Sequence, residues 1–419
     1  MVSFGSRKHG GIPVNAKVPR SLSLAVVVVL AGCTASVGFK VDESNEKGSA
    51  QLISRGPASQ PDFGTQPKRG SEPDTAAPTT KPTPGLVGLY GELQDQWTMS
   101  SGRYDGSSNV SQITFATEGA CSDPDVDASG ERMVFASTQH STTSDIYVKS
   151  TRGRTLTQLT TDPADDIMPV FHPLGDRIAF ASNRAGNWDI YVMSTDGGQP
   201  MKLTDERDHE LHPSWSPDGR RLIYCKLGSK SGRWEIWGVD TQNPGVRRFL
   251  DYGLFPQWCP DVARSKILFQ RSRRRGSRYF GIWTIDYVND DAVHPTEIVS
   301  AGNAAVINPG WSADGSRIVF VTVVEPEENA GEDESIGQSD IWIVSLDGSG
   351  RTNLTNGRYA NYQPVWSGDG RVYFVSNRTG VDNIWSVTTA RAMETLKPHP
   401  ARITTATPGY NTPQQVGRP

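Results

Sequence analysis

The stretch PSWSPDGRRLIYCK, residues 213–226, carries the pattern that decides the fold of this chain. Its SPDG tetrapeptide predicts a tight turn, because Asp and Gly tolerate the left-handed backbone that a hairpin loop requires. In the equivalent run RIAFA, residues 177–181, apolar, β-branched and aromatic residues together are typical of a strand buried on both faces. The stretch therefore predicts a β-hairpin with a buried second strand.

The same pattern occurs six times beyond residue 110. The units align on six prolines that lie 43 to 55 residues apart: Pro124, Pro169, Pro213, Pro256, Pro309 and Pro364. Each unit continues with a second apolar strand, such as SDIYV or SDIWIV, and most end on an L-T motif, as in TQLTT or TNLTN. Repeats of this length with four short strands indicate an all-β, six-bladed β-propeller of four-stranded antiparallel blades. Stacking such blades in a ring buries faces that a single blade would expose.

The first unit contains Asp123, Asp125 and Asp127 at alternate positions, which suggests a calcium-binding loop. The sixth loop position, however, is Ala128 rather than glycine, and the twelfth is Val134 rather than glutamate. Asp127 to Gly130 instead occupy the hairpin column of the repeat. We therefore assign these aspartates to the first blade and expect no metal site and no cofactor.

The repeat, of the form P-x-W-S-P-D-G, I-x-F-x-S-x-R, D-I-Y and L-T, resembles that of TolB-type propellers, a WD40-like repeat. It is also similar to the propellers of prolyl-oligopeptidase-like peptidases and oligogalacturonate lyases. The resemblance implies the fold rather than the chemistry. The tandem Ser182, Asn183 and Arg184, and likewise Ser376 to Arg378, match this pattern, and we expect them to bond strands and blades. TolB itself carries an α/β domain where this chain has a proline-rich segment, so its partner is not transferred.

A candidate binding site follows from the column before the aligned prolines, where the innermost strand of each blade begins. We predict that this column lines the channel mouth: Asp123, Met168, His212, Phe255, Asn308 and Gln363. One acid and one imidazole form a conceivable acid/base pair, but the other members suit peptide or glycan binding better than bond cleavage.

An enzymatic role is the alternative. No G-x-S-x-G nucleophile elbow occurs in the sequence, so a serine hydrolase is not indicated. A lyase-like enzyme acting on polysaccharide would need several histidines on a metal, and His172, His209 and His212 are the only clustered set. The acidic run around Asp205 is more typical of a solvated loop. We therefore predict a non-enzymatic binding platform for a protein or for a peptidoglycan or other glycan partner, and a monomer that binds no nucleic acid.

Two oppositely charged loops suggest a second surface. The fourth unit contains RSRRRGSR, residues 271–278, and the fifth contains EPEENAGEDESIGQ, residues 325–338. The two loops either neutralise each other, which contributes only about 0–1 kcal/mol, or form a rim that steers a charged partner. The candidate rim residues are Arg271, Arg273, Arg274, Arg275, Arg278, Glu325, Glu327, Glu328, Glu332, Asp333 and Glu334.

The N-terminus is typical of an exported protein. Basic residues precede the apolar run SLSLAVVVVLAG, which is too short for a permanent membrane helix and ends at Cys33. Leu30 to Cys33 resemble the lipobox of bacterial lipoproteins, which implies a signal peptide over residues 1–32 and a lipid on Cys33. We expect a membrane-anchored lipoprotein that faces the periplasm, with the outer membrane favoured over the inner.

The remaining organisation follows from composition. Residues 33–85 are rich in Pro, Ser and Thr and predict a disordered tether. Residues 86–109 are expected to pack on the propeller, residues 110–406 to form it, and residues 407–419 to be a tail. SQITF at 111–115 and RITTA at 402–406 both match the outermost strand, and the sequence leaves open which one closes the ring. It also leaves open whether Cys225 and Cys259 pair.

Overall fold

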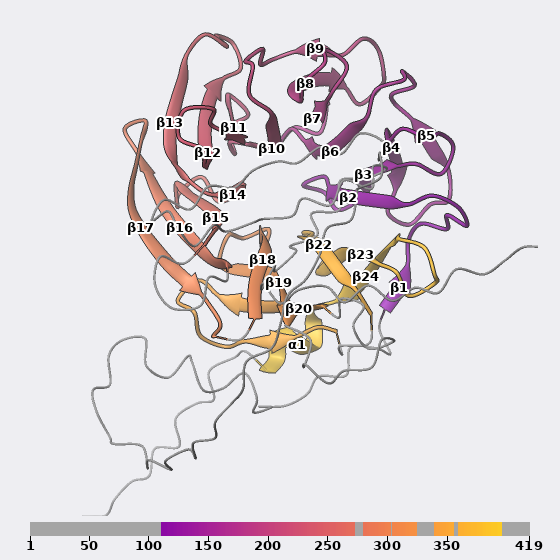
Figure 1. Ribbon diagram of the computed structural model, residues 1–419. Coiled ribbons are helices and arrows are strands. Elements are labelled where there is room, and N and C mark those ends of the chain that lie inside the picture. The colour runs from indigo at the N-terminus through magenta and orange to yellow at the C-terminus, as the bar shows by residue number, and fades with distance from the viewer. Residues whose placement is uncertain (1–109, 273–279, 303, 325–338, 356–358, 396–419) are drawn as a thin grey trace, which may run out of the picture.

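The computed structural model describes residues 110–272, 280–302, 304–324, 339–355 and 359–395. These residues form six separate four-stranded antiparallel sheets, which lie as blades around a common centre (Figure 1). The all-β, six-bladed propeller predicted from the repeats is confirmed. Among the described residues, no helix has the length and apolar character needed to cross a membrane.

Each blade runs from an inner strand to an outer one. The first three blades comprise β2 (Cys121–Val126), β3 (Arg132–Ser137), β4 (Asp145–Ser150) and β5 (Leu156–Gln158); β6 (Asp166–Phe171), β7 (Arg177–Ser182), β8 (Asp189–Ser194) and β9 (Met201–Lys202); and β10 (Glu210–Trp215), β11 (Arg221–Leu227), β12 (Trp234–Asp240) and β13 (Arg247–Tyr252). Strand order within each of these blades follows the sequence.

The fourth and fifth blades repeat this order. They comprise β14 (Leu254–Trp258), β15 (Lys266–Ser272), β16 (Phe280–Val288) and β17 (Asp291–Val299); and β18 (Ala304–Trp311), β19 (Arg317–Val324), β20 (Ser339–Ser345) and β21 (Thr352–Asn353). The sixth blade comprises β22 (Asn361–Trp366), β23 (Arg371–Ser376), β24 (Asn383–Thr388) and, as its outermost strand, β1 (Val110–Gln112). A short helix, α1 (Ala390–Thr395), follows β24.

The ring is closed by β1, the first strand among the described residues. β1 pairs antiparallel with β24, with Val110 opposite Val387 and Gln112 opposite Trp385 (Figure 1). The first strands also contact one another in an unbroken cycle, because β2 packs against both β6 and β22. The SQITF segment thus completes the last blade, whereas RITTA lies outside the described residues.

A threonine shows that SQITF is the missing repeat element. In three blades the Thr of the L-T motif accepts a hydrogen bond from an Ile N–H of the third strand, as Thr160 does from Ile146 at 2.9 Å. Thr204 and Thr355 do the same. Thr114 accepts the corresponding bond from Ile384 at 2.8 Å, although 270 residues separate them. The N-terminal segment therefore supplies to the sixth blade the hydrogen bond that three other units form within themselves.

The core lies within and between the blades. The second strands contribute a column of fully buried aromatic rings: Phe135, Phe180, Tyr224, Phe269, Phe320 and Phe374. The first strands end on a column of aromatic residues, in which Trp215, Trp258 and Trp311 are buried and Val126 takes the place of an aromatic residue. Burial of such rings is the main stabilising contribution in a fold of this kind.

Candidate functional site

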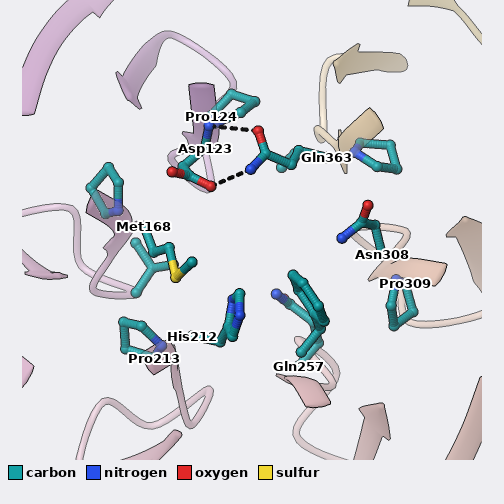
Figure 2. A pocket seen from close by; sticks show the side chains of 14 residues that line it. Asp123, Pro124, Met168, His212, Pro213, Gln257, Asn308, Pro309 and Gln363 are labelled. Carbon is teal, nitrogen blue, oxygen red and sulfur yellow. Dashed lines mark hydrogen bonds between the residues drawn. The ribbon is translucent and has the colours of Figure 1, made fainter. Parts of the chain in front are cut away.

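The six residues of the predicted channel column lie together around one cavity of about 90 Å³ at the centre of the ring (Figure 2). The cavity is lined by the residue before the aligned proline from every blade and by five of the six prolines, all except Pro256. The structure therefore brings these residues together as the sequence predicts. That they bind a ligand stays a prediction.

A backbone irregularity that all six blades share aims these side chains inward. Each residue has a left-handed backbone, with φ between 48° and 55°, and each coincides with a β-bulge between the first and second strands. The following proline has no N–H for the strand ladder, which is why proline within sheets occurs at bulges. A left-handed backbone costs a non-glycine residue of order 1–2 kcal/mol, so the packed ring must hold all six in place.

Neighbouring blades satisfy backbone N–H groups that the bulges remove from the ladder. The Asp123 N–H donates to Oε1 of Gln363 at 2.9 Å. The Asn308 N–H donates to Oε1 of Gln270, also at 2.9 Å. Gln363 also donates from Nε2 to Oδ1 of Asp123, so two hydrogen bonds join the first and last blades inside the channel (Figure 2).

Burial sets the electrostatics of the channel. It raises the pKa of Asp123 to about 7, although hydrogen bonds from the Met168 N–H and the Ser122 hydroxyl oppose the shift. It lowers the pKa of His212 to about 3, so this imidazole is neutral at physiological pH. The described residues that line the cavity include no Lys or Arg. Asp123 is therefore the one lining group whose charge changes near neutral pH.

The three clustered histidines do not converge. His212 lies in the channel, with its ring 3.8 Å from that of Phe255. His172 lies in the hairpin of the second blade and packs edge-on against Trp215 at 4.8 Å. His209 accepts a hydrogen bond from the Trp188 N–H. Within the described part of the chain, no three His, Cys, Asp or Glu side chains are grouped so as to hold a metal ion.

The acidic run 205–210 is not a uniformly solvated loop. Glu206 pairs with Lys226 and, at 2.7 Å, with Arg247, and Arg247 also contacts Asp205. Glu210 is fully buried at the start of β10, where burial raises its pKa to about 8. The expectation of an exposed cluster is therefore wrong for Glu210, because the inner strand draws it between the blades.

The other candidate residues lie largely outside the site. Arg271 pairs with Asp251 of the neighbouring blade and donates to the Tyr252 carbonyl at 2.9 Å. The remaining candidate rim residues, and Cys33, fall outside the described residues. Cys225 and Cys259 are buried free thiols, as is Cys121, so the structure contains no bond between them.

Sequence reasoning missed a residue that the bulge also turns inward. Gln257 lines the cavity two positions after Phe255 (Figure 2). Asp125, two positions after Asp123, does not line the cavity and instead accepts a hydrogen bond from the Phe171 N–H of the second blade at 2.7 Å; burial raises its pKa to about 7. Gln257 could have been found from the sequence by counting two positions along the inner strand from Phe255, across the proline, because side chains alternate with a period of two in a strand.

The fold and the channel identify the chain as a closed six-bladed β-propeller with a narrow central cavity. Residues 106–279 match the family model described as the TolB beta propeller domain. No curated protein matches the chain.

Solved structures similar to this chain share little of its sequence. A putative TolB from Agrobacterium tumefaciens is 19% identical, covers 67% of this chain and 96% of its own, and gives a TM-score of 0.49. An oligogalacturonate lyase from Vibrio parahaemolyticus is 12% identical over 67% of this chain and 93% of its own, with a TM-score of 0.46. The propeller domain of the Trilobed protease from Pyrococcus furiosus is 18% identical over 65% and 82%, with a TM-score of 0.41.

Proposed function

We propose that this chain is an exported lipoprotein, anchored to an envelope membrane through Cys33, whose TolB-type propeller binds an envelope protein or cell-wall component. The sequence before residue 110 supports the export and the anchor, since a basic segment and a short apolar run end at Cys33. The propeller supports the binding role, because a ring of blades collects side chains from six repeats at one place.

The observation that carries the binding role is the channel ring itself. The six residues that face the cavity have a left-handed backbone, which is energetically unfavourable for a residue other than glycine. Strained backbone that the surrounding structure over-determines is typical of functional sites. Because the strain recurs in every blade at the same position, we infer that the ring is the recognition site rather than a packing defect.

The chemistry of the ring favours binding over catalysis. A general acid or base works best with a pKa near the operating pH, whereas burial lowers the pKa of His212 to about 3. Asp123 has a suitable pKa, but its carboxyl group already accepts a hydrogen bond from the side chain of Gln363. The ring thus offers one titrating carboxyl without a matched partner, which suits recognition of a ligand.

Site-specific photo-crosslinking in intact cells tests this proposal. A photoreactive residue at Met168 should give discrete adducts, and replacing Asn308 and Gln363 by alanine should abolish them. Leu174, which is 80% exposed in a hairpin, provides the control position. Adducts that form equally well in the variant with alanine at both positions would contradict a binding site in the channel. Turnover in a polysaccharide-degradation screen, with stoichiometric metal in the purified protein, would favour the enzyme instead.

The anchor has its own test. Cys33→Ala should abolish incorporation of labelled fatty acid and release the protein from the membrane fraction. A variant that stays in the membrane and remains labelled would contradict lipidation at this residue.

A further inference from the structure

The channel lining can carry a negative charge, and its described residues include no positively charged side chain. The lining has one carboxyl, Asp123, and among the described lining residues no cationic side chain. Two donors that an anion could use are engaged, since the Asp123 N–H is bound by Gln363 and the Asn308 N–H by Gln270. An incoming anion would therefore meet a carboxyl, and its remaining donors would be uncharged groups such as the amides of Asn308 and Gln257.

The rest of the cavity suits a cation that carries an alkyl stem. The ring of Phe255 presents a π system, which attracts ammonium groups. The neutral imidazole of His212 and the amide of Asn308 can each accept a hydrogen bond, and within the described chain neither side chain has a hydrogen-bond partner. Met168 and the ring of prolines supply apolar walls (Figure 2).

The number of ligands that a cation requires distinguishes between cations. A calcium ion takes six to eight oxygen ligands, which one carboxyl and a few amides among apolar walls do not supply. A primary ammonium needs three acceptors at most and tolerates apolar surface around its stem.

We propose that the channel ring binds a primary ammonium group on an unbranched alkyl stem, such as a lysine side chain carries, with Asp123 as its counter-ion. This inference rests on the binding function proposed above and names the chemistry that the site recognises. A cation beside Asp123 favours its ionised form, so binding should release a proton near pH 7. Of the neighbouring groups, Asp125 also titrates there, whereas His212 and Tyr362 do not.

Calorimetric titration of the full chain with n-butylammonium, butyrate and the amide of N-acetyl-lysine tests the proposal. We expect the two ammonium compounds to bind and butyrate not to bind. Asp123→Asn should weaken ammonium binding at least about tenfold, and Asp125→Asn should leave it within about twofold, because Asp125 does not line the cavity. Two buffers of different ionisation enthalpy should reveal proton release in the parent and none in Asp123→Asn.

Each other result overturns the proposal. These results are butyrate binding as well as butylammonium, no binding of either ammonium compound, or binding that Asp123→Asn leaves unchanged. Should Asp123→Asn fail to give a cooperative melt, Asn308→Leu replaces it, with the same loss expected. Tighter binding of the lysine amide indicates a peptide-borne ammonium, and tighter binding of butylammonium a free amine. Ring-dependent photo-adducts without ammonium binding would overturn this inference and leave the proposed function standing.

Discussion

Single residues decide how the blades approach one another at the hairpins. Gly219 of the third blade has φ +69°, and a Cβ there would lie 2.1 Å from Nε2 of His172 in the second blade. The sequence predicted this glycine as a turn residue, because the SPDG pattern requires it. The sequence did not show that the same glycine makes room for a ring from the next repeat, since that contact depends on how the blades pack.

Gly219→Ala should therefore destabilise the protein more than the same change at Gly370. Gly370 has φ +77° but open space around it, so Gly370→Ala costs only the backbone strain, about 1–2 kcal/mol. Gly219→Ala adds the clash with His172, a further ~1–3 kcal/mol. Urea unfolding of both variants measures the difference. Equal losses would show that the hairpins do not pack as described.

The buried carboxyl of Glu210 should give the protein a pH-dependent weakness. The unfolded chain ionises this group near pH 4.5, whereas the fold holds it protonated to about pH 8. Its stabilising contribution is thus fully present below pH 4.5 and is lost as the pH rises to about 8, by at most ~1.4 kcal/mol per pH unit. Glu210→Gln should therefore become increasingly more stable than the parent across this window.

Glu206→Gln is the matched control. Burial would raise the pKa of Glu206, but Lys226 and Arg247 hold it below its ordinary value. This variant should lose stability relative to the parent at neutral pH and not gain it. Free energies of unfolding between pH 5 and pH 8 check both signs, and a Glu210→Gln difference that is flat with pH would contradict the burial of an uncharged Glu210.

At the scale of elements, the S-N-R tandem joins strands as the repeat pattern predicted. Arg184, just after β7, donates from Nη2 to both carboxyl oxygens of Asp166 in β6 at 2.9 Å. In the sixth blade, Arg378 makes the same contact with an amide, Asn361, at 3.0 Å. The motif showed which residues bond. It did not show that Asp166 is fully buried, which depends on the adjacent blade.

The arginine–asparagine contact of the sixth blade predicts the effect of replacing the aspartate in the second blade. Asp166→Asn copies the Asn361 contact and should change the free energy of unfolding by less than about 1 kcal/mol. Arg184→Ala leaves a buried carboxyl without its cation and should cost about 3–5 kcal/mol. Thermal or chemical unfolding measures the loss of stability in the two variants. Similar losses for both would mean that the ion pair between Arg184 and Asp166 is not needed to hold the strands together.

At the scale of the whole molecule, repeats fixed the number of blades in advance, but not the closure of the ring. SQITF and RITTA have the same apolar and threonine pattern, so local sequence could not choose between them. The choice depends on long-range contacts: Asn383 of β24 bonds Thr114 and both backbone groups of Ala116. The channel column was predictable from the prolines, whereas the pKa values of Asp123 and His212 required the closed ring that buries them.

The account depends on a ring closed by the N-terminal strand, since an open ring would not hold Asp123 and Gln363 together in one cavity. Hydrogen exchange followed by mass spectrometry tests this closure directly, by comparing residues 110–116 with residues 383–388. We expect both segments to be protected to the same degree and to exchange together in one cooperative opening. Exchange of residues 110–116 at the rate of an unstructured peptide, while residues 383–388 stay protected, would contradict the closed ring and the site within it.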